Sequence, residues 1–354
     1  MHSPPSHGNP ICPTISCDVC VFGAGPAGIA VAISLAAKGV SVVLLGRPLQ
    51  TKPWGGESFT SAIRTPLQAL GCWEQFQRAG HRCVYERQSA WGSEPHIESS
   101  IFRGDGPTWH VDREKFDQDL RSAALARGIP LISYRGLKSI TRESGSWHLV
   151  LDEEIRIRAA YLVDATGRAR ALARRLRARI ESHDALIGLC CAVPRSENGV
   201  EIQSMMLETT SFGWWYAAPT PNGHVVAILT DADLAPTELR HRLRPVAANS
   251  SFTYMDGLAG WLAIGDACAS HDPLCGWGVC RALTNGILAA DAVFGFLASG
   301  ETARLEDYCD HCYRQYTRYL GGLAARYAIE RRWPTAPFWQ RRHRPVSFAR
   351  SDRT

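Results

Sequence analysis

The amino-acid sequence predicts an α/β fold, in which a Rossmann-like nucleotide-binding domain carries an inserted, mostly antiparallel β-sheet and ends in a helical C-terminus. Three observations predict this arrangement. An apolar run from Val19 to Phe22 is followed by Gly-x-Gly-x-x-Gly and then by an apolar helical pattern. β-like segments follow one another between residues 185 and 230. Helical patterns dominate from residue 281 onward.

The motif Gly23-x-Gly25-x-x-Gly28 lies between a strand and a helix, and each glycine has a physical reason. Gly23 permits the sharp turn, Gly25 lets the backbone approach a pyrophosphate, and Gly28 lets the helix pack closely on the strand. The N-terminus of the helix offers free N–H groups and a positive dipole end to phosphates. A second strand follows over residues 40–45. In this context the motif predicts a dinucleotide site.

Composition is typical of an ordinary globular protein. The 354 residues are 45% hydrophobic and carry a formal net charge of +5. No apolar run reaches the length that spans a membrane, and the first ten residues lack the basic and apolar segments of a signal peptide. We therefore expect a cytoplasmic protein that binds no membrane, with residues 1–16 as a disordered tail.

The twelve cysteines are expected to be reduced and mostly structural. Several lie within apolar segments, where a free thiol behaves as a small hydrophobic group. Cys309 and Cys312 have the spacing of metal ligands, but no second Cys/His pair stands at the distance of a zinc site. We expect no metal site.

Arginine carries almost all of the positive charge, since the chain has only four lysines. The densest basic run spans residues 168–179, where leucine and alanine recur at helical spacing. A solvent-exposed helix face is the favoured interpretation, and a docking face for an acidic partner or a nicotinamide phosphate is the alternative. No aromatic-interleaved basic motif is present, so we expect no nucleic-acid binding.

The order of the segments indicates a discontinuous nucleotide-binding domain. Asp112 suits the N-cap of a helix, and the apolar segment 159–167 is a further buried strand that ends in a turn. The predicted nucleotide-binding segments are 17–54, 101–180 and 255–300, the predicted substrate-domain segments are 55–100 and 181–254, and the helical C-terminal region is 301–354.

Three patches, in this order, resemble the FAD-dependent monooxygenases and tryptophan-halogenase-like flavoproteins with the glutathione-reductase-type fold. They are the glycine motif, residues 164–168 (Asp-Ala-Thr-Gly-Arg), and Gly265-Asp266-Ala267 followed by residues 272–278 (Asp-Pro-Leu-Cys-Gly-Trp-Gly). Further segments are similar to the flavoproteins that modify tryptophan in quinone-cofactor amine dehydrogenases and amino-acid oxidases. These segments are 55–58, 89–93, 109–113, 116–117, 213–219, 332–334 and 337–339. The resemblance extends from residue 17 to about residue 342.

The resemblance implies that FAD is the cofactor. Asp266 would hold a ribityl hydroxyl, the loop after it would lie against the pyrimidine edge of the flavin, and the next helix would direct its dipole at the reduced ring. The expected cofactor-binding residues are Gly23, Gly25, Gly28, Arg47, Ser58, Arg113, Asp266, Pro273, Gly276 and Gly278. One departure is Gly46, because many FAD enzymes have an acidic residue there that binds the adenosine ribose. Arg47 would instead lie over the adenine or reach a phosphate.

The implied activity is that of a monooxygenase that hydroxylates an electron-rich aromatic ring through a flavin C4a-(hydro)peroxide, with NAD(P)H as a transient reductant. The substrate would be a tryptophan side chain of a partner peptide or protein, or a small aromatic molecule. Trp214, Trp215 and Tyr216 are candidates for lining its space, with Trp215 on the opposite strand face from the other two. His271 is a candidate base, but a hydrogen-bonded loop histidine is the favoured interpretation.

Three alternatives remain open. The first is a flavin-dependent halogenase, for which the resemblance implies a lysine between Lys52 and Lys115, where none occurs. The second is an FAD-binding accessory protein that assists the maturation of a partner with little turnover of its own. The third is a flavin reductase of prenyl chains, which the aromatic and polar texture of residues 205–230 disfavours.

Overall fold

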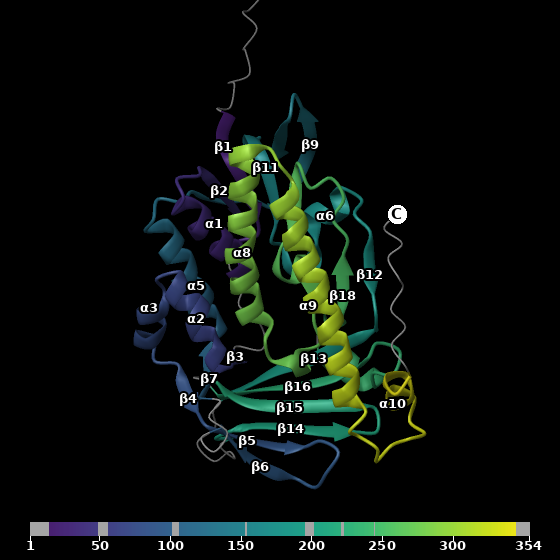
Figure 1. The fold of residues 1–354 in the computed structure, drawn as a ribbon. Helices are drawn as coiled ribbons and strands as arrows, with labels where there is room; N and C mark the ends of the chain where they lie inside the picture. Colours follow the sequence, from purple (N-terminus) through teal and green to yellow (C-terminus); the bar gives the residue numbers. More distant parts are fainter. Residues whose placement is uncertain are drawn as a thin grey trace, which may run out of the picture.

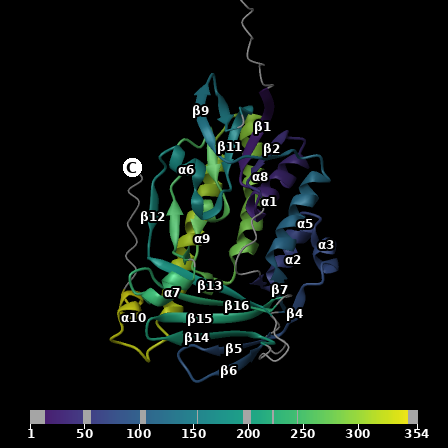
Figure 2. The same ribbon diagram turned by 180° about the vertical axis from the view of Figure 1, so that it is seen from behind.

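The computed structural model describes residues 14–48, 56–100, 106–152, 154–194, 202–220, 223–243 and 245–344. Two large sheets dominate the fold. In Figure 1 the nucleotide-binding sheet and its helices lie above the second sheet, and Figure 2 shows the same arrangement from behind. Most of the predicted tail 1–16 lies outside the described residues. Strand β1 nevertheless begins at Thr14, so the end of that segment belongs to the first sheet.

The first sheet has the strand order β8-β2-β1-β11-β10-β9, and β19 also pairs with β11. Its parallel strands are β1 (Thr14–Phe22), β2 (Val42–Gly46), β8 (Leu131–Ser133), β11 (Arg156–Asp164) and β19 (Trp261–Ala263). An antiparallel edge is formed by β9 (Leu137–Glu143) and β10 (Ser146–Leu151). The whole of β2 and the second half of β1 are buried, as expected for a parallel sheet that is covered by helices. The predicted βαβ unit and the strand within 159–167 are confirmed.

Helices α1 (Pro26–Ala36) and α8 (Gly278–Ser299) pack against each other beside this sheet. A Cβ atom at Gly286 would lie 2.6 Å from the carbonyl oxygen of Ala27, so the two helices approach through their backbones. By length and composition α8 could cross a membrane, but here it is a core helix packed against α1. Helix α5 (Arg113–Leu125) has the predicted N-cap, because the Asp112 side chain accepts a hydrogen bond from the backbone N–H of Lys115 at 3.0 Å.

The second sheet has the order β17-β13-β16-β15-β14-β5-β6 and is antiparallel except for the β14–β5 pair. The predicted strands correspond to β13 (Leu186–Pro194), β14 (Met205–Thr210), β15 (Gly213–Thr220) and β16 (Gly223–Asp231). The sheet is completed by β5 (Glu86–Ala90), β6 (His96–Ser99) and β17 (Pro245–Ala247), and α7 (Thr237–Arg242) follows β16. The inserted antiparallel sheet that the sequence predicts is therefore present.

The segment 55–100, predicted as part of the substrate domain, divides between the two layers. Only β5 and β6 join the second sheet, whereas β3 (Gly56–Phe59) and β4 (Arg82–Val84) pair with β7 (Thr108–Asp112). Between them lie η1 (Ser61–Ile63), α2 (Arg64–Ala69) and α3 (Trp73–Arg78). Phe59, Leu67 and Phe76 pack in the same core as β1 and α1, and this packing holds the first part of the segment to the nucleotide-binding layer. A small third sheet contains β12 (Ile180–Ser182), β18 (Ser251–Thr253) and β20 (Ala269–Ser270).

The basic run 168–179 does not form the predicted exposed helix. Only α6 (Ala171–Arg175) is helical, and Arg170 before it is left-handed with a φ of +47°. Arg170 is buried, and its guanidinium donates a hydrogen bond to the hydroxyl of Ser251 at 2.7 Å. Arg168 donates to a backbone carbonyl of the loop that follows β20. These two arginines bind the chain itself, which weakens the docking-face alternative.

The C-terminal region is helical as predicted, with α9 (Ala303–Tyr327) and α10 (Pro337–Arg342). Residues 345–354 lie outside the described part of the chain. In Figure 1 the lower end of α9 crosses the second sheet, and α10 lies at the edge of that sheet. A second core forms there, with Trp91, Trp214, Tyr327, Phe338 and Trp339 as its largest members. This aromatic core joins the C-terminal helices to the second sheet.

Candidate cofactor site and active site

The glycine turn is built as a cradle with one open position. A Cβ atom at Gly23 would lie 2.2 Å from the carbonyl oxygen of Ala165, and one at Gly28 would lie 1.8 Å from the carbonyl oxygen of Gly23. The fold itself therefore requires glycine at both positions. At Gly25 no atom lies within 4 Å of such a Cβ, although this residue is the N-cap of α1 and has an ordinary φ of −92°. Gly25 thus leaves space for a ligand at an N-terminus without a side-chain cap.

The second patch holds its own turn. Asp164 is fully buried, and one carboxylate oxygen accepts hydrogen bonds from the N–H and hydroxyl of Thr166 at 2.9 and 2.6 Å. The other oxygen accepts from the N–H of Ala173 at 2.8 Å. Because both of its oxygens accept hydrogen bonds in this way, Asp164 is a structural residue. It fixes the turn in which the carbonyl oxygen of Ala165 lies against Gly23.

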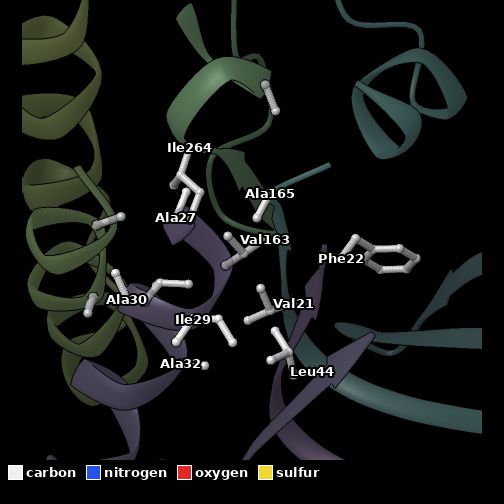
Figure 3. Packing of buried hydrophobic residues seen from close by; sticks show 14 of the residues in the cluster. Val21, Phe22, Ala27, Ile29, Ala30, Ala32, Leu44, Val163, Ala165 and Ile264 are labelled. Carbon is white, nitrogen blue, oxygen red and sulfur yellow. The ribbon is translucent and has the colours of Figure 1, made fainter. Parts of the chain in front are cut away.

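The third patch meets the other two in space. A Cβ atom at Gly265, which has a φ of +55°, would lie 2.8 Å from the Cβ of Ala27 in the first turn of α1. The preceding N–H of Ile264 donates to the carbonyl oxygen of Asp164 at 2.9 Å. Figure 3 shows Ala27, Ala165 and Ile264 gathered above the buried strands. Three turns that are far apart in the sequence therefore converge at one end of the parallel sheet, where such sheets bind nucleotides.

Asp266 is the partly exposed acid of this region. Its side chain is 39% exposed, and one oxygen lies 3.6 Å from Nε of Arg168. Burial raises the pKa of Asp266, Arg168 lowers it, and the nearby Glu57 raises it further. The carboxylate has an accepting oxygen available for a hydroxyl, as the ribityl hypothesis requires.

The loop 271–278 completes the site. The Asp272 side chain caps the short helix η4 (Pro273–Cys275) by accepting from the N–H of Leu274 at 2.8 Å. No atom lies within 4 Å of a Cβ built at Gly276, which has a φ of +63°, or at Gly278. Like α1, α8 begins without a side-chain cap. Two positive helix ends, open glycines and one accepting carboxylate fit a dinucleotide such as FAD.

His271 lies on the side of this loop that faces α9. Its ring is T-shaped to Tyr319 with centroids 4.3 Å apart, and the residue is only 6% exposed. Burial, with Arg281 and Arg168, holds the pKa of His271 well below its usual range, so the ring is neutral. Its position favours a packed loop histidine over a base that reaches the substrate.

The end of β2 explains the missing acidic residue. A Cβ atom at Gly46 would lie 2.8 Å from the Cβ of Ala24, so the fold has no room for a side chain there. Arg47 is exposed, and its carbonyl oxygen accepts two hydrogen bonds from the guanidinium of Arg121, each at 3.2 Å. Nε of Arg121 also donates to the carbonyl oxygen of Ala24 at 3.1 Å. Arg121 joins the glycine turn to the end of β2, and we found no signal for this role in the sequence.

The two remaining predicted cofactor residues have partners within the protein. The hydroxyl of Ser58 lies 2.8 Å from Nδ1 of His110, a partner on the neighbouring strand. Arg113 is buried, with its guanidinium paired to Glu57 and, at 3.0 Å, to Asp117. Glu57 is 40% exposed and lies on β3, a strand of the nucleotide-binding layer that contacts β15. Arg113 therefore orients Glu57 at the border of the two layers.

His110 gives a testable pH dependence. Burial, and then Arg82, lowers the pKa of His110 from 6.5 to about 4. As pH falls below 6.5 the unfolded chain takes up this proton first, so the stabilisation present above that pH is lost towards pH 4. We expect the wild type to lose about 3 kcal/mol more unfolding free energy than His110→Asn over this range, measured by urea denaturation. Equal losses in the two proteins would contradict this assignment.

The second sheet presents aromatic residues on the face towards α9. Trp214 is 1% exposed, and its Nε1 donates to the hydroxyl of Tyr327 at 3.0 Å. Tyr216 lies on the same face, and the ring centroids of Trp214 and Tyr216 are 6.2 Å apart. Burial, Cys190 and Glu57 raise the pKa of Tyr216. Trp215 lies on the opposite face, since successive strand residues alternate. The structure therefore brings Tyr216, but not Trp215, to the border of the two layers.

The pair Cys309 and Cys312 is buried on α9. Cys312 and Cys268, which follows the Asp266 turn, affect each other's pKa through a hydrogen bond between their thiols. Within the described part of the chain, no group of three His, Cys, Asp or Glu side chains is arranged to hold a metal ion. Cys309 and Cys312 pack in the main hydrophobic core, as small apolar side chains do.

Comparisons with known proteins agree on one class. The model of a family described as "FAD binding domain" matches residues 16–246. The chain is 30% identical to LodB of Marinomonas mediterranea, named as an FAD-dependent oxidoreductase, over 93% of this chain and 97% of LodB. It is 26% identical to a 1H-pyrrole-2-carbonyl-(peptidyl-carrier protein) brominase of Pseudoalteromonas luteoviolacea, over 78% of this chain and 77% of the brominase.

Solved structures share the fold. The peptidyl tryptophan dihydroxylase QhpG, essential for tryptophylquinone cofactor biogenesis, superposes with a TM-score of 0.74 at 20% identity, covering 92% of this chain and 78% of QhpG. The flavin-dependent halogenase CmlS superposes with a TM-score of 0.79 at 20% identity, covering 94% of this chain and 68% of CmlS. Hydroxylating and halogenating enzymes thus have the same architecture as this protein.

Proposed function

Because the chain belongs to the FAD-binding domain family and is an FAD-dependent oxidoreductase, we propose that it is a monooxygenase that hydroxylates an electron-rich aromatic ring. The proposed substrate is a tryptophan side chain of a partner peptide or protein, or a small aromatic molecule. We also propose NAD(P)H as the transient reductant and the cytoplasm as the location. QhpG, which has the same fold, acts on peptidyl tryptophan according to its name, and LodB aligns over nearly its whole length.

One observation supports this proposal above the others. The converging turns that fit FAD belong to the layer that lies next to the aromatic face of the second sheet. At the border between the two layers, β15 with Tyr216 contacts β3 with Glu57. An apolar and aromatic wall with the carboxylate of Glu57 at its border suits a flat, electron-rich ring and excludes water.

Each part of the site has a distinct proposed role. When bound, FAD supplies the redox chemistry with O₂. The backbone at Gly25 and the start of α1 would bind its pyrophosphate, Asp266 would accept a ribityl hydroxyl, and the start of α8 would stabilise negative charge on the ring. Tyr216 would orient the substrate ring, and Glu57, held by Arg113, would accept its N–H or stabilise positive charge that develops on it.

Halogenation is the second candidate, because a brominase and several halogenases are among the similar proteins. The described lysines do not favour it. Lys38, Lys115 and Lys138 each pair with a carboxylate of the nucleotide-binding layer, namely Asp291, Asp119 and Glu154. Lys52 lies outside the described residues.

The test is turnover with ¹⁸O₂ in the presence of bromide, with FAD, a reductant and a panel of tryptophan-containing peptides and small indoles. We expect a product that carries ¹⁸O, and we expect Tyr216→Leu to lower kcat/KM about tenfold while Trp215→Leu leaves it unchanged. Mass spectrometry of the products gives the answer. A brominated product without ¹⁸O would contradict the proposed hydroxylation and would support halogenation.

A further inference from the structure

Two tyrosines of helix α9 form hydrogen bonds with Asp272 of loop 271–278. The hydroxyl of Tyr319 accepts a hydrogen bond from the backbone N–H of Asp272 at 2.6 Å. The hydroxyl of Tyr327 donates to the carboxylate of the same Asp272 at 2.7 Å. The other carboxylate oxygen of Asp272 caps η4 by accepting from the N–H of Leu274. Both carboxylate oxygens therefore bind groups of the protein. Its interactions hold the shape of the loop.

The same chain of hydrogen bonds reaches the second sheet. The hydroxyl of Tyr327 accepts from Nε1 of Trp214 while it donates to Asp272. The three residues are 2%, 1% and 1% exposed, so none of these groups has water as a substitute partner. Loop 271–278 and the aromatic sheet face are therefore fixed relative to each other through one hydroxyl group.

We propose that Tyr327 is a positioning residue, which holds loop 271–278 against the aromatic sheet face through the chain Trp214–Tyr327–Asp272 and thereby keeps the FAD-binding loop ordered. This inference rests on FAD binding at that loop, which is part of the proposed function.

The surroundings of Asp272 make its ionisation sensitive to this one contact. The pKa of Asp272 is raised to about 6, because the effect of burial outweighs the hydrogen bonds from Leu274 and Tyr327, which lower it. The other groups that act on this carboxyl are Asp184, which raises the pKa, and Arg342 of α10, which lowers it. Among the described residues, Tyr319, Cys275 and the neutral His271 are further titratable neighbours, and the charges of Arg281 and Asp266 act on the same loop at Cys275. The pKa lies close enough to neutrality that losing one donor changes the charge.

Protonation of Asp272 weakens it as an acceptor for the N–H of Leu274, so η4 and the open glycines after it lose their anchor. FAD affinity should therefore fall as the pH drops below about 6. Removing the hydroxyl of Tyr327 raises the pKa of Asp272 further, so in that variant the affinity should begin to fall at a higher pH.

The experiment compares apoproteins of the wild type, Tyr327→Phe and Tyr316→Phe by FAD titration between about pH 5 and pH 8, with flavin fluorescence as the readout. Tyr316 is a matched control, because it is 1% exposed on the same helix and its hydroxyl has no hydrogen-bond partner among the described residues. We expect Tyr327→Phe to weaken FAD binding about tenfold near pH 7 and to move the inflection to higher pH. Tyr316→Phe should match the wild type.

A second variant keeps the test decisive if Tyr327→Phe does not fold. Asp272→Asn retains a side chain of the same shape but cannot titrate, and we expect the inflection to disappear. The proposal is overturned if Tyr327→Phe and Tyr316→Phe give the same affinity and inflection, or if the inflection persists in Asp272→Asn. FAD binding is measured without turnover, so a failure to hydroxylate any substrate would count against the proposed function and leave this test valid.

Discussion

Gly25→Val is expected to lower the affinity for FAD by about 100-fold or more while the protein stays folded. A side chain at this position meets no protein atom within 4 Å, and the backbone conformation is one that any residue adopts. The new side chain would instead occupy the space that the pyrophosphate needs against the start of α1. Flavin fluorescence titration measures the affinity, and thermal unfolding of the apoprotein measures the stability.

Gly321→Val is the matched control for this substitution. Gly321 also has no atom within 4 Å of a built Cβ and has no positive φ, but it is exposed in helix α9, outside the three converging turns. We expect its FAD affinity to equal that of the wild type. If the two valine variants bind FAD equally well, Gly25 is not at the phosphate site.

Glu330→Ala is expected to destabilise the fold by about 2–3 kcal/mol, because it leaves the buried hydroxyl of Thr209 and the N–H of Gly92 without their acceptor and removes the partner of Arg332. Glu330 is fully buried, and its carboxylate accepts from the N–H of Gly92 at 2.9 Å, the hydroxyl of Thr209 at 2.6 Å and the guanidinium of Arg332 at 2.7 Å. These contacts join the segment after α9 to strands β5 and β14. Urea denaturation measures the loss.

We also expect the contribution of Glu330 to the free energy of unfolding to be lost in acid. Burial alone would raise the pKa of Glu330, but the hydrogen bonds of Arg332, Thr209 and Gly92 lower it to about 2. The stabilisation is therefore present above pH 4.5 and is lost as the pH falls towards 2. Glu74→Ala is the control, since Glu74 makes an exposed pair with Arg78 and should change stability by no more than about 0.5 kcal/mol. A cost for Glu330→Ala as small as this would refute the assigned role.

The patterns that predicted the fold are local. Gly23, Gly25 and Gly28 between a strand and a helix identify the nucleotide-binding turn, and strand-like alternation over 185–230 identifies the second sheet. Asp112 as an N-cap was equally predictable, because a cap depends on neighbouring residues alone. These features need no knowledge of distant contacts.

Other features depend on contacts between distant segments, which periodicity does not show. Arg170 appeared as one member of a solvated basic run, but a left-handed turn buries it under Ser251 and Thr253. Residues 56–84 lie with the nucleotide-binding layer because their apolar side chains meet the core of β1 and α1. Tyr327 and Glu330 carried no signal, since their partners Asp272, Gly92 and Thr209 are more than 50 residues away. Gly46 looked like a lost ribose contact and proves to be a steric requirement.

The most direct test of the central claim is a crystal structure of the protein with FAD bound. We expect the pyrophosphate against Gly25, a ribityl hydroxyl on Asp266, and the flavin ring beside Gly276 and within reach of Tyr216. A flavin that lies away from Asp266, or whose ring is turned away from the aromatic sheet face, would contradict the single site that the three converging turns form.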